Sequence, residues 1–394
     1  MSEPSAPPEP RFGDYYRAIY ARGLAGERPS LPVSWTELER RAEEAMESRT
    51  ASYVYAGAGT GDTMRANLEA FRRWRIVPRM LRDVSEVKLA TTILGTASSA
   101  PVLLAPIGVQ TIVHPDGELA SARAAAALGV PFVASTASAH TLEQIADAGG
   151  GPRWYQLYWP NDLELAASFV RRAEAAGYGA IVVTVDTFIP GWKPRDLQEA
   201  WLPFLEGVGN ANYLQDPVFR AALERSPEED LGAALGRYLS VYVNPSLTWD
   251  DLDWLRETTS LPILLKGILH ADDAREAVAR GVDGIVVSNH GGRQVDGAIA
   301  SLDALPAVVD AAGDEIAILL DSGIRSGADV IKALALGADA ILLGRPYIWG
   351  LALGGQNGVE TVLRMLLAEL ELTMALSGVA SIERLDRSAL EPAH

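Results

Sequence analysis

The architecture of the chain can be predicted outward from residues 284–294, Gly284-Ile285-Val286-Val287-Ser288-Asn289-His290-Gly291-Gly292-Arg293-Gln294. Its apolar start is mostly β-branched, and the polar, glycine-rich residues after it predict a buried strand that ends in a loop. His290 and Arg293 then lie together at the carboxyl end of a strand. A histidine exchanges protons near neutral pH, and an arginine binds a carboxylate through two parallel hydrogen bonds. The pairing predicts chemistry on a small carboxylic acid.

The same arrangement recurs after Pro101, where short apolar runs alternate with alanine-rich amphipathic segments. The eight runs are Pro101–Pro106, Pro131–Ser135, Trp154–Tyr158, Ala180–Thr187, Pro262–Leu269, Gly284–Ser288, Ala317–Asp321 and Ala340–Gly344. The helices expected between them include Glu118–Leu128, Leu163–Ala176, Asp272–Arg280 and Ala328–Leu336. This period predicts an α/β fold, a single (β/α)8 TIM barrel. The runs are apolar at successive positions, as in buried parallel strands, and an open doubly wound sheet is the alternative.

Three segments fall outside this period. Residues 1–12 are rich in Pro, Ser and Glu and are expected to form a disordered tail before the barrel domain at residues 13–394. Residues 15–76 are expected to form an N-terminal helical segment with interruptions. The segment 188–247, after the fourth strand, is too long for a plain connection. Its bulky aromatic residues favour a lid over the barrel mouth, and a partly disordered surface excursion is the alternative.

Composition excludes several classes of function. The 394 residues include 34 Lys and Arg against 51 Asp and Glu, and the net charge of −17 disfavours nucleic acid and anionic membranes as partners. The absence of cysteine excludes disulfides, thiolate metal sites and cysteine nucleophiles. The N-terminus lacks the features of a signal peptide, and no apolar run reaches the roughly 18 to 20 residues of a membrane helix. We therefore expect a soluble, cytoplasmic protein.

Polar side chains gather at the predicted carboxyl ends of the strands, where TIM barrels carry their active sites. They are Ser135, Gln156, Tyr158, Thr184, Asp186, Lys266, His290, Arg293, Asp321, Arg325 and Arg345. The glycine-rich turns 321–327 and 344–345, after the seventh and eighth strands, are typical of a phosphate site. Lys266 is the only lysine within a predicted strand and needs an anionic or electron-rich partner. It is expected either to form a Schiff base or to stabilise negative charge on a flavin ring.

Other kinds of site have weaker support. The five histidines are His114, His140, His270, His290 and His394. No two of them have the i, i+4 spacing of a helical metal site, so no metal is expected. The Gly-x-Ser-x-Gly elbow of a serine hydrolase is missing. The glycine cluster at residues 56–62 ends in Asp62, where a dinucleotide fingerprint has its last glycine, and no strand precedes it.

These motifs resemble those of the FMN-dependent L-2-hydroxy acid oxidising enzymes, which include glycolate oxidase, lactate oxidase, mandelate dehydrogenase and lactate 2-monooxygenase. The resemblance extends from about Tyr15 to the last helix, and its most specific motif is Ser288–Gln294. The supporting motifs are Leu265–Ile268, Asp321–Arg325 and Gly344–Pro346. Within the family, Tyr155–Tyr158, Gly191–Leu197 and the long insertion look most similar to lactate 2-monooxygenase.

The resemblance implies a role for each residue that faces the substrate. His290 would take a proton from the substrate, with Asp186 orienting and charging its imidazole. Arg293 and Tyr53 would bind the substrate carboxylate, and Tyr158 its hydroxyl. A positioned base and an anchored carboxylate suit oxidation at the carbon next to a carboxylate.

The resemblance also implies one bound FMN and a homo-oligomer, a tetramer or an octamer. Lys266 would lie beside N1 and O2 of the flavin ring and stabilise its reduced anion. The other residues implied to bind FMN are Pro106, Ile107, Gly108, Ser135, Gln156, Thr184, Ser288, Asp321, Gly323, Arg325, Gly344 and Arg345.

Three positions depart from the family pattern and bear on the substrate. Lys193 stands where relatives have an arginine that pairs with the substrate carboxylate, and lysine lacks the planar fork. We expect either that Arg195 compensates or that the substrate differs. Ala137 replaces a larger side chain and predicts a roomier pocket, and Tyr55 replaces a small one.

The lid leads to a prediction about oxygen. Release of the 2-keto acid and hydrogen peroxide would make the enzyme an oxidase, whereas enclosing both would let peroxide decarboxylate the keto acid. Because Trp201, Phe204, Tyr213 and Phe219 are expected to close the mouth, lactate 2-monooxygenase activity, from L-lactate and O2 to acetate, CO2 and water, is the main expectation. The alternative is an L-2-hydroxy acid oxidase acting on a bulkier substrate such as a mandelate. A Schiff-base aldolase using Lys266, or a flavin-binding barrel without activity, is more remote.

Overall fold

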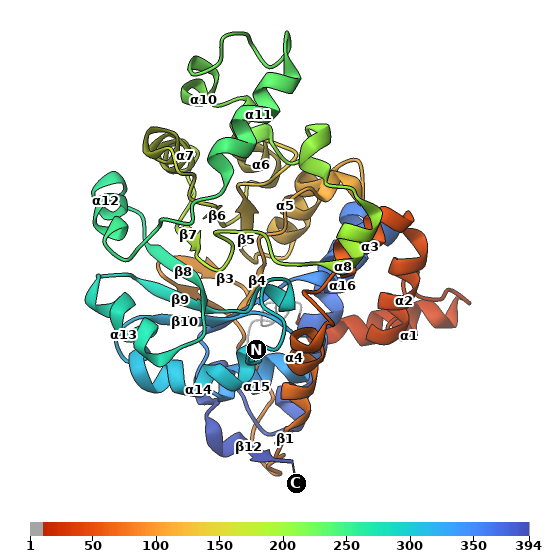
Figure 1. Ribbon diagram of the computed structural model, residues 1–394. Helices are drawn as coiled ribbons and strands as arrows, with labels where there is room; N and C mark the ends of the chain where they lie inside the picture. The colour runs from red at the N-terminus through yellow and green to blue at the C-terminus, as the bar shows by residue number, and fades with distance from the viewer. Residues whose placement is uncertain (1–10, 394) are drawn as a thin grey trace, which may run out of the picture.

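The computed structural model describes residues 11–393, so residues 1–10 of the tail predicted over residues 1–12 lie outside the described residues, and Phe12, its last residue, begins a 3-10 helix. Eight parallel strands close into a barrel in the order β10-β11-β4-β5-β6-β7-β8-β9 (Figure 1). They are β4 (Val102–Leu104), β5 (Phe132–Ser135), β6 (Arg153–Leu157), β7 (Ile181–Thr184), β8 (Ile263–Ile268), β9 (Gly284–Val287), β10 (Ala317–Leu320) and β11 (Ala340–Leu343). Seven of the predicted runs contain one strand each, and β6 begins one residue before its run; the closed order confirms the (β/α)8 barrel and excludes the open sheet.

Helices connect these strands and cover the outside of the barrel (Figure 1). They are α5 (Gly117–Ala127), α6 (Leu142–Gly149), α7 (Leu163–Ala175), α12 (Asp251–Thr258), α13 (Ala271–Ala279), α14 (Ser301–Ala312), α15 (Gly327–Ala335) and α16 (Arg345–Leu376). The four helices predicted by their ranges begin and end within one residue of the observed bounds. No helix within residues 11–393 has both the length and the hydropathy needed to cross a bilayer.

The barrel interior is a packed core that is closed at its amino end. Alternate strand side chains, Trp154 among them, form one fully buried cluster inside the barrel. A hairpin of β2 (Thr91–Ile93) and β3 (Thr96–Ser98) adds Ile93 to this cluster, and Trp154 Nε1 donates to Thr96 Oγ1 over 2.9 Å. Ligands therefore have access to the barrel from its carboxyl end.

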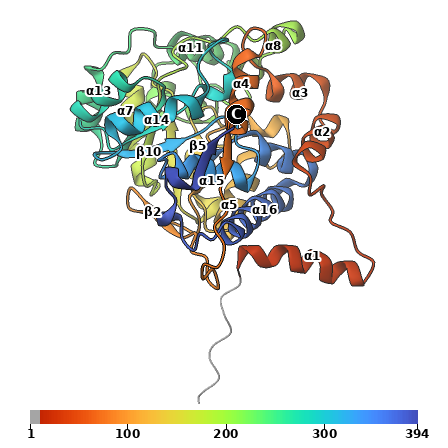
Figure 2. The same cartoon turned by 90° about the horizontal axis from the view of Figure 1, so that it is seen from below.

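The N-terminal segment is helical, as predicted, except at its end. It comprises the 3-10 helix η1 (Phe12–Asp14) and helices α1 (Tyr15–Leu24), α2 (Trp35–Ala45), α3 (Ser48–Tyr55) and α4 (Asp62–Arg72). Helix α1 has no buried residue and stands apart from the barrel (Figure 2). Residues Trp74–Ile76, predicted to end the helical segment, instead form β1, which pairs antiparallel with β12 (Leu390–Pro392). The partner that makes this segment a strand lies at the other end of the chain.

The glycine cluster at residues 56–62 connects α3 to α4. Its backbone binds the carboxylate of Asp296, which accepts from Asp62 N over 2.7 Å and from Thr63 N over 3.2 Å. Gly59 has φ +51°, and a Cβ there would lie 2.7 Å from Asp296 Cβ. These glycines therefore serve a close approach between two loops.

Residues 188–247 form a helical substructure between β7 and α12. Its elements are α8 (Pro194–Glu199), η3 (Pro203–Glu206), α9 (Ala211–Leu214), α10 (Pro217–Ala221) and α11 (Leu231–Tyr242). Tyr213 and Phe219 are fully buried, with ring centroids 5.8 Å apart, and Tyr213 also packs on Phe169 of α7. The remaining short helices are η2 (Gln110–Ile112), η4 (His290–Gly292), η5 (Ile382–Arg384) and η6 (Arg387–Ala389).

Candidate active site

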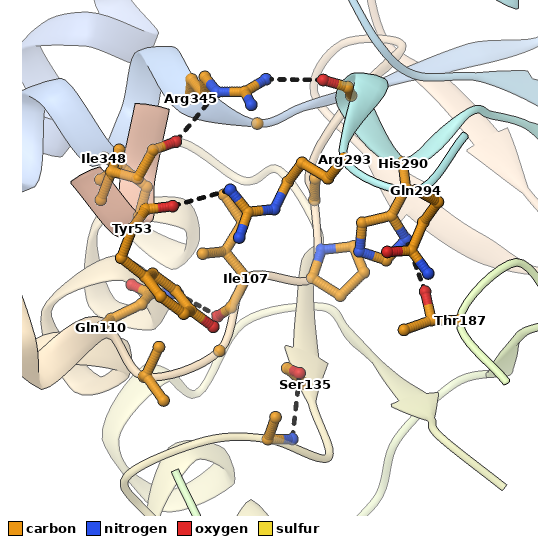
Figure 3. Close-up of a pocket in the computed structure, with 18 of the residues that line it drawn as sticks. Tyr53, Ile107, Gln110, Ser135, Thr187, His290, Arg293, Gln294, Arg345 and Ile348 are labelled. Atoms are coloured by element: carbon orange, nitrogen blue, oxygen red, sulfur yellow. Dashed lines mark hydrogen bonds between the residues drawn. The ribbon is translucent and has the colours of Figure 1, made fainter. Parts of the chain in front are cut away.

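A cavity of about 350 Å³ lies at the carboxyl end of the barrel, between the strand ends, α3 and residues 188–247 (Figure 3). The predicted site residues that line it are Tyr53, Pro106, Ile107, Gly108, Ser135, Tyr158, Lys193, Lys266, His290, Arg293, Asp321, Gly323, Arg325, Gly344 and Arg345. Four more lie directly behind this lining. Gln156 accepts from Ser135 and donates to Thr184, each over 2.9 Å, while Asp186 contacts His290 and Ser288 contacts Lys266. The fold thus brings together every residue predicted for the site.

His290 is held by two residues that follow β7. Asp186 Oδ1 lies 2.8 Å from His290 Nδ1, and Thr187 Oγ1 lies 3.1 Å from the same nitrogen. Because the carboxylate occupies Nδ1, Nε2 is the ring nitrogen left to exchange a proton. Burial acts to raise the pKa of Asp186, but the charges of His290 and Lys266 outweigh it and lower that pKa. Asp186 is therefore ionised and stabilises positive charge on the imidazole.

Lys266 is a fully enclosed cation on β8. Its Nζ lies 3.1 Å from Asp321 Oδ2 and donates to Ser288 Oγ over 2.9 Å. Burial acts to lower the pKa of Lys266, yet Asp321 and Asp186 raise it above its usual value. The next residue, Gly267, has φ +118°, and a Cβ there would lie 2.7 Å from Asp186 Cβ. The glycine at position 267 lets the His290–Asp186 pair and Lys266 occupy neighbouring positions.

Arg293 points into the cavity between Tyr53 and Ile107 (Figure 3). Its Nη1 donates to the backbone oxygens of Tyr53 and Ala56, over 2.7 and 3.0 Å, and its guanidinium lies 5.2 Å from the Tyr53 ring centroid. Nη2 has only a distant ionic neighbour, Asp196 at 3.9 Å. With one nitrogen fixed by backbone, the guanidinium is oriented to bind a carboxylate.

The three departures from the family pattern have different positions in the structure. Lys193 lines the cavity, where its Nζ donates to Gly191 O over 3.2 Å. Arg195 does not compensate for it, because its side chain is half exposed, lies outside the cavity lining and pairs with Glu43 at 3.0 Å. Ala137 forms part of the cavity wall. Tyr55 does not line the cavity, and its hydroxyl donates to the backbone of α2.

Three arginines concentrate positive charge at the end of the cavity near β10 and β11. Burial, reinforced by Arg293 and Arg325, lowers the pKa of Arg345 to about 9, and burial also lowers the pKa of Arg325. Neither Arg325 nor Arg345 forms an ion pair with a carboxylate of residues 11–393, and the buried Nε of Arg325 has no hydrogen-bond partner there. A guanidinium keeps its proton at neutral pH, so this cluster requires an anion. The phosphate of FMN fits it.

We expect Arg325→Met to weaken FMN binding by about 1.5 kcal/mol, roughly tenfold, because a charge-assisted hydrogen bond to the phosphate is lost. The measurement is titration of the apoprotein with FMN, in which quenching of the flavin fluorescence reports binding. Arg195→Met is the matched control, since Arg195 lies outside the cavity and pairs with Glu43. Equal affinity in both variants would contradict the assignment of the phosphate site.

Several residues of the cavity are not among those predicted from the sequence. Thr187, Asp196 and Gln294 line it, and Gln294 Nε2 donates to Asp186 O over 2.7 Å. Gln294 belongs to the quoted motif and Thr187 follows Asp186, so their position next to predicted site residues could have indicated that they line the cavity. Asp196 belongs to the quoted segment Gly191–Leu197, but whether its side chain faces the cavity depends on how α8 packs.

One of the four aromatic residues predicted to close the mouth lines the cavity, and the other three do not. Phe204 lines the cavity, but Tyr213 and Phe219 pack in the core of the 188–247 substructure. Trp201 packs against the Tyr53 ring, with centroids 6.4 Å apart, and is outside the cavity lining. Tyr238 and Tyr242 of α11 line the cavity in their place.

Comparisons with known proteins agree with this arrangement. A sequence model described as FMN-dependent dehydrogenase matches residues 42–392. L-lactate oxidase from Lysinibacillus sphaericus is 46% identical over 93% of this chain and 94% of its own length. The FMN-dependent alpha-hydroxy acid dehydrogenase qulF of Penicillium citrinum is 44% identical over 97% of this chain and 96% of its own. A crystal structure of mandelate oxidase superposes with a TM-score of 0.82 at 40% identity, covering 92% of this chain and 98% of that one.

Proposed function

The chain belongs to the FMN-dependent dehydrogenase family as an FMN-dependent 2-hydroxy acid oxidoreductase, and from this premise we propose that it is an oxidase that releases a 2-keto acid and hydrogen peroxide. Relatives named as lactate, 2-hydroxyacid and mandelate oxidases support this proposal. They favour the oxidase alternative over the lactate 2-monooxygenase that the sequence first suggested. The single observation that carries the chemistry is that His290, Arg293 and Lys266 line one cavity.

Each of these residues has one task in the oxidation of R-CH(OH)-COO⁻ to R-CO-COO⁻, which releases two electrons and two protons. Arg293 and Tyr53 bind the carboxylate, and Tyr158 contacts the hydroxyl. His290 accepts one proton at Nε2, and ionised Asp186 stabilises the resulting imidazolium. FMN, when bound, would accept the two electrons with the second proton, and O2 would then take up both electrons and both protons as hydrogen peroxide. Lys266 supplies a fixed positive charge where that electron density accumulates.

We propose that the substrate carries an apolar side chain larger than the methyl group of lactate. Small Ala137 leaves room on one wall of the cavity, and Val109, Phe204, Tyr238 and Tyr242 are among the apolar and aromatic residues around it. Apolar lining favours burial of an apolar side chain by the hydrophobic effect. The similarity to mandelate oxidase supports an aryl or branched 2-hydroxy acid.

The test is incubation of the holoenzyme in air with a panel from glycolate and L-lactate to L-mandelate. Peroxide, 2-keto acid and the acid shortened by one carbon are quantified, with added catalase preventing secondary decarboxylation in a parallel set. One peroxide per keto acid supports the oxidase. The shortened acid forming in the presence of catalase would overturn it in favour of the monooxygenase.

Lys193 is expected to make substrate binding depend on pH. Burial, reinforced by the charge of Arg293, lowers the pKa of Lys193 below its usual value. The ammonium attracts the substrate carboxylate and is lost as pH rises through this lowered pKa, so KM should rise, about fivefold, toward alkaline pH. Lys193→Arg keeps its charge throughout and should flatten this rise. An unchanged pH profile of KM in this variant would contradict the role.

The remaining alternatives have weaker support. A Schiff-base aldolase needs an uncharged amine, whereas Asp321 and Asp186 keep Lys266 charged. The homo-oligomer and the cytoplasmic location stay predictions, for which gel filtration and cell fractionation are the measurements.

A further inference from the structure

Three residues of the cavity have left-handed backbone conformations although none is glycine: Val109, before η2, and two that lie next to the Lys266–Asp321 ion pair, His290 and Ser322. His290 has φ +58° and Ser322 has φ +77°. This region favours glycine, because a Cβ crowds the neighbouring backbone. His290 has an assigned task, but Ser322 has none, and its backbone alone would be better served by glycine. Its side chain is the part of the residue that needs an explanation.

The loop of His290 is fixed to Lys266 on one side. The backbone N–H of His290 donates to Ser288 Oγ over 3.0 Å, and the same oxygen accepts from Lys266 Nζ over 2.9 Å. Lys266 Nζ in turn lies 3.1 Å from Asp321 Oδ2. These contacts connect the backbone of the base to the buried ion pair.

The hydroxyl of Ser322 completes this connection on the other side. It donates to Asp321 Oδ1 over 2.7 Å and accepts from the backbone N–H of Gly291 over 2.9 Å. Gly291 follows His290 directly, so the contacts form a closed ring through Ser288, Lys266, Asp321 and Ser322. Within this ring the backbone N–H groups of His290 and Gly291 each donate to a serine hydroxyl, that of Ser288 and that of Ser322.

We propose that Ser322 is a positioning residue that couples the base to the cation at the flavin ring. It acts through Gly291 to hold the backbone of His290, and through Asp321 to set how strongly the carboxylate neutralises Lys266. A hydroxyl that donates to one carboxylate oxygen disperses part of the negative charge, which leaves the ammonium more available to electron density on the flavin. This inference rests on the proposed function for the roles of His290 and Lys266.

Removing the hydroxyl has two expected consequences. The N–H of Gly291 loses its acceptor, so the base is held less well and the limiting rate of flavin reduction by substrate falls about tenfold, with little change in KM. The charge of Asp321 then concentrates on Lys266, so the reduced flavin is less stabilised and its reduction potential becomes more negative. A residue that only shapes a turn would not change the potential.

The experiment compares Ser322→Gly with Ser322→Ala in the FMN-loaded enzyme. Both variants lack the hydroxyl, but glycine relieves the left-handed backbone whereas alanine retains it. Three quantities are measured: the limiting anaerobic reduction rate in stopped flow, the potential by titration against a reference dye, and FMN content with thermal stability. Ser322→Gly is expected to fold and keep FMN, because its backbone is relaxed.

A slower rate and a more negative potential in both variants are the expected result. The proposal is overturned if Ser322→Gly matches the wild type in rate and potential, because the effect in Ser322→Ala would then be backbone strain. It is equally overturned by slower reduction without a change in potential, or by loss of FMN from both variants. The dye titration needs no substrate, so it decides about Ser322 even if no 2-hydroxy acid reduces the wild type and the proposed function fails.

Discussion

Replacing His290 with Gln should slow anaerobic reduction of the flavin by substrate about a thousandfold while FMN stays bound. Glutamine keeps a polar side chain of similar reach but cannot accept a proton near neutral pH. FMN binding should survive because the arginine cluster that fits the phosphate, Arg325 with Arg345, does not include the base. The potential should change little, since Lys266 and Asp321 keep their contact. Stopped-flow absorbance under nitrogen measures the rate of flavin reduction, and the absorbance spectrum gives the FMN content.

His270→Gln is the matched control for this variant. His270 is an exposed histidine at the start of α13, and its Nδ1 accepts from Asp272 N over 3.1 Å. It should reduce at the wild-type rate. Reduction of His290→Gln within a few-fold of the wild type would contradict the assignment of the base.

Arg293→Lys is expected to lower kcat/KM by roughly 30- to 150-fold, equivalent to about 2–3 kcal/mol of transition-state stabilisation. An ammonium keeps the charge but cannot bind the carboxylate through two parallel hydrogen bonds. It also loses the hydrogen bonds of Nη1 to the backbone of Tyr53 and Ala56, which orient the side chain. Steady-state kinetics with the best substrate of the panel measures the loss.

The control for this variant is Arg195→Lys, which changes the same side chain outside the cavity. Comparing a 2-hydroxy acid with its amide sharpens the test, because the amide lacks the charge that Arg293 pairs with. The ratio of kcat/KM for the acid to kcat/KM for the amide should be large in the wild type and smaller in Arg293→Lys. Equal discrimination would mean that another group binds the carboxylate.

The barrel could be predicted from sequence because its signals are local. A strand buried on both faces appears as a continuous apolar run, and its helix as an amphipathic segment, so each of the eight units is visible by itself. The site followed from the same pattern. Once the ends of the strands are known, residues such as Ser135, Lys266 and Asp321 must lie at one rim.

The parts that sequence did not predict depend on packing between distant segments. Nothing local in residues 188–247 says that Tyr238 and Tyr242 face the cavity while Tyr213 and Phe219 face each other. The direction of Arg195 depends on Glu43 of α2, far away in the chain. The strand β1 exists only because β12 lies beside it. The left-handed backbone of Ser322 has no pattern in the sequence at all.

The pairing of β1 with β12, together with closure of the barrel between β4 and β11, has a consequence for synthesis on the ribosome. Both contacts join segments that are far apart in the chain, so neither can form until the later strand, β12 or β11, has been synthesised. Contacts of such large sequence separation are slow to form and leave strand edges exposed meanwhile. The cavity that fits FMN is lined by residues from Tyr53 to Ile348, so it too can be complete only after β11 and the start of α16 have been synthesised.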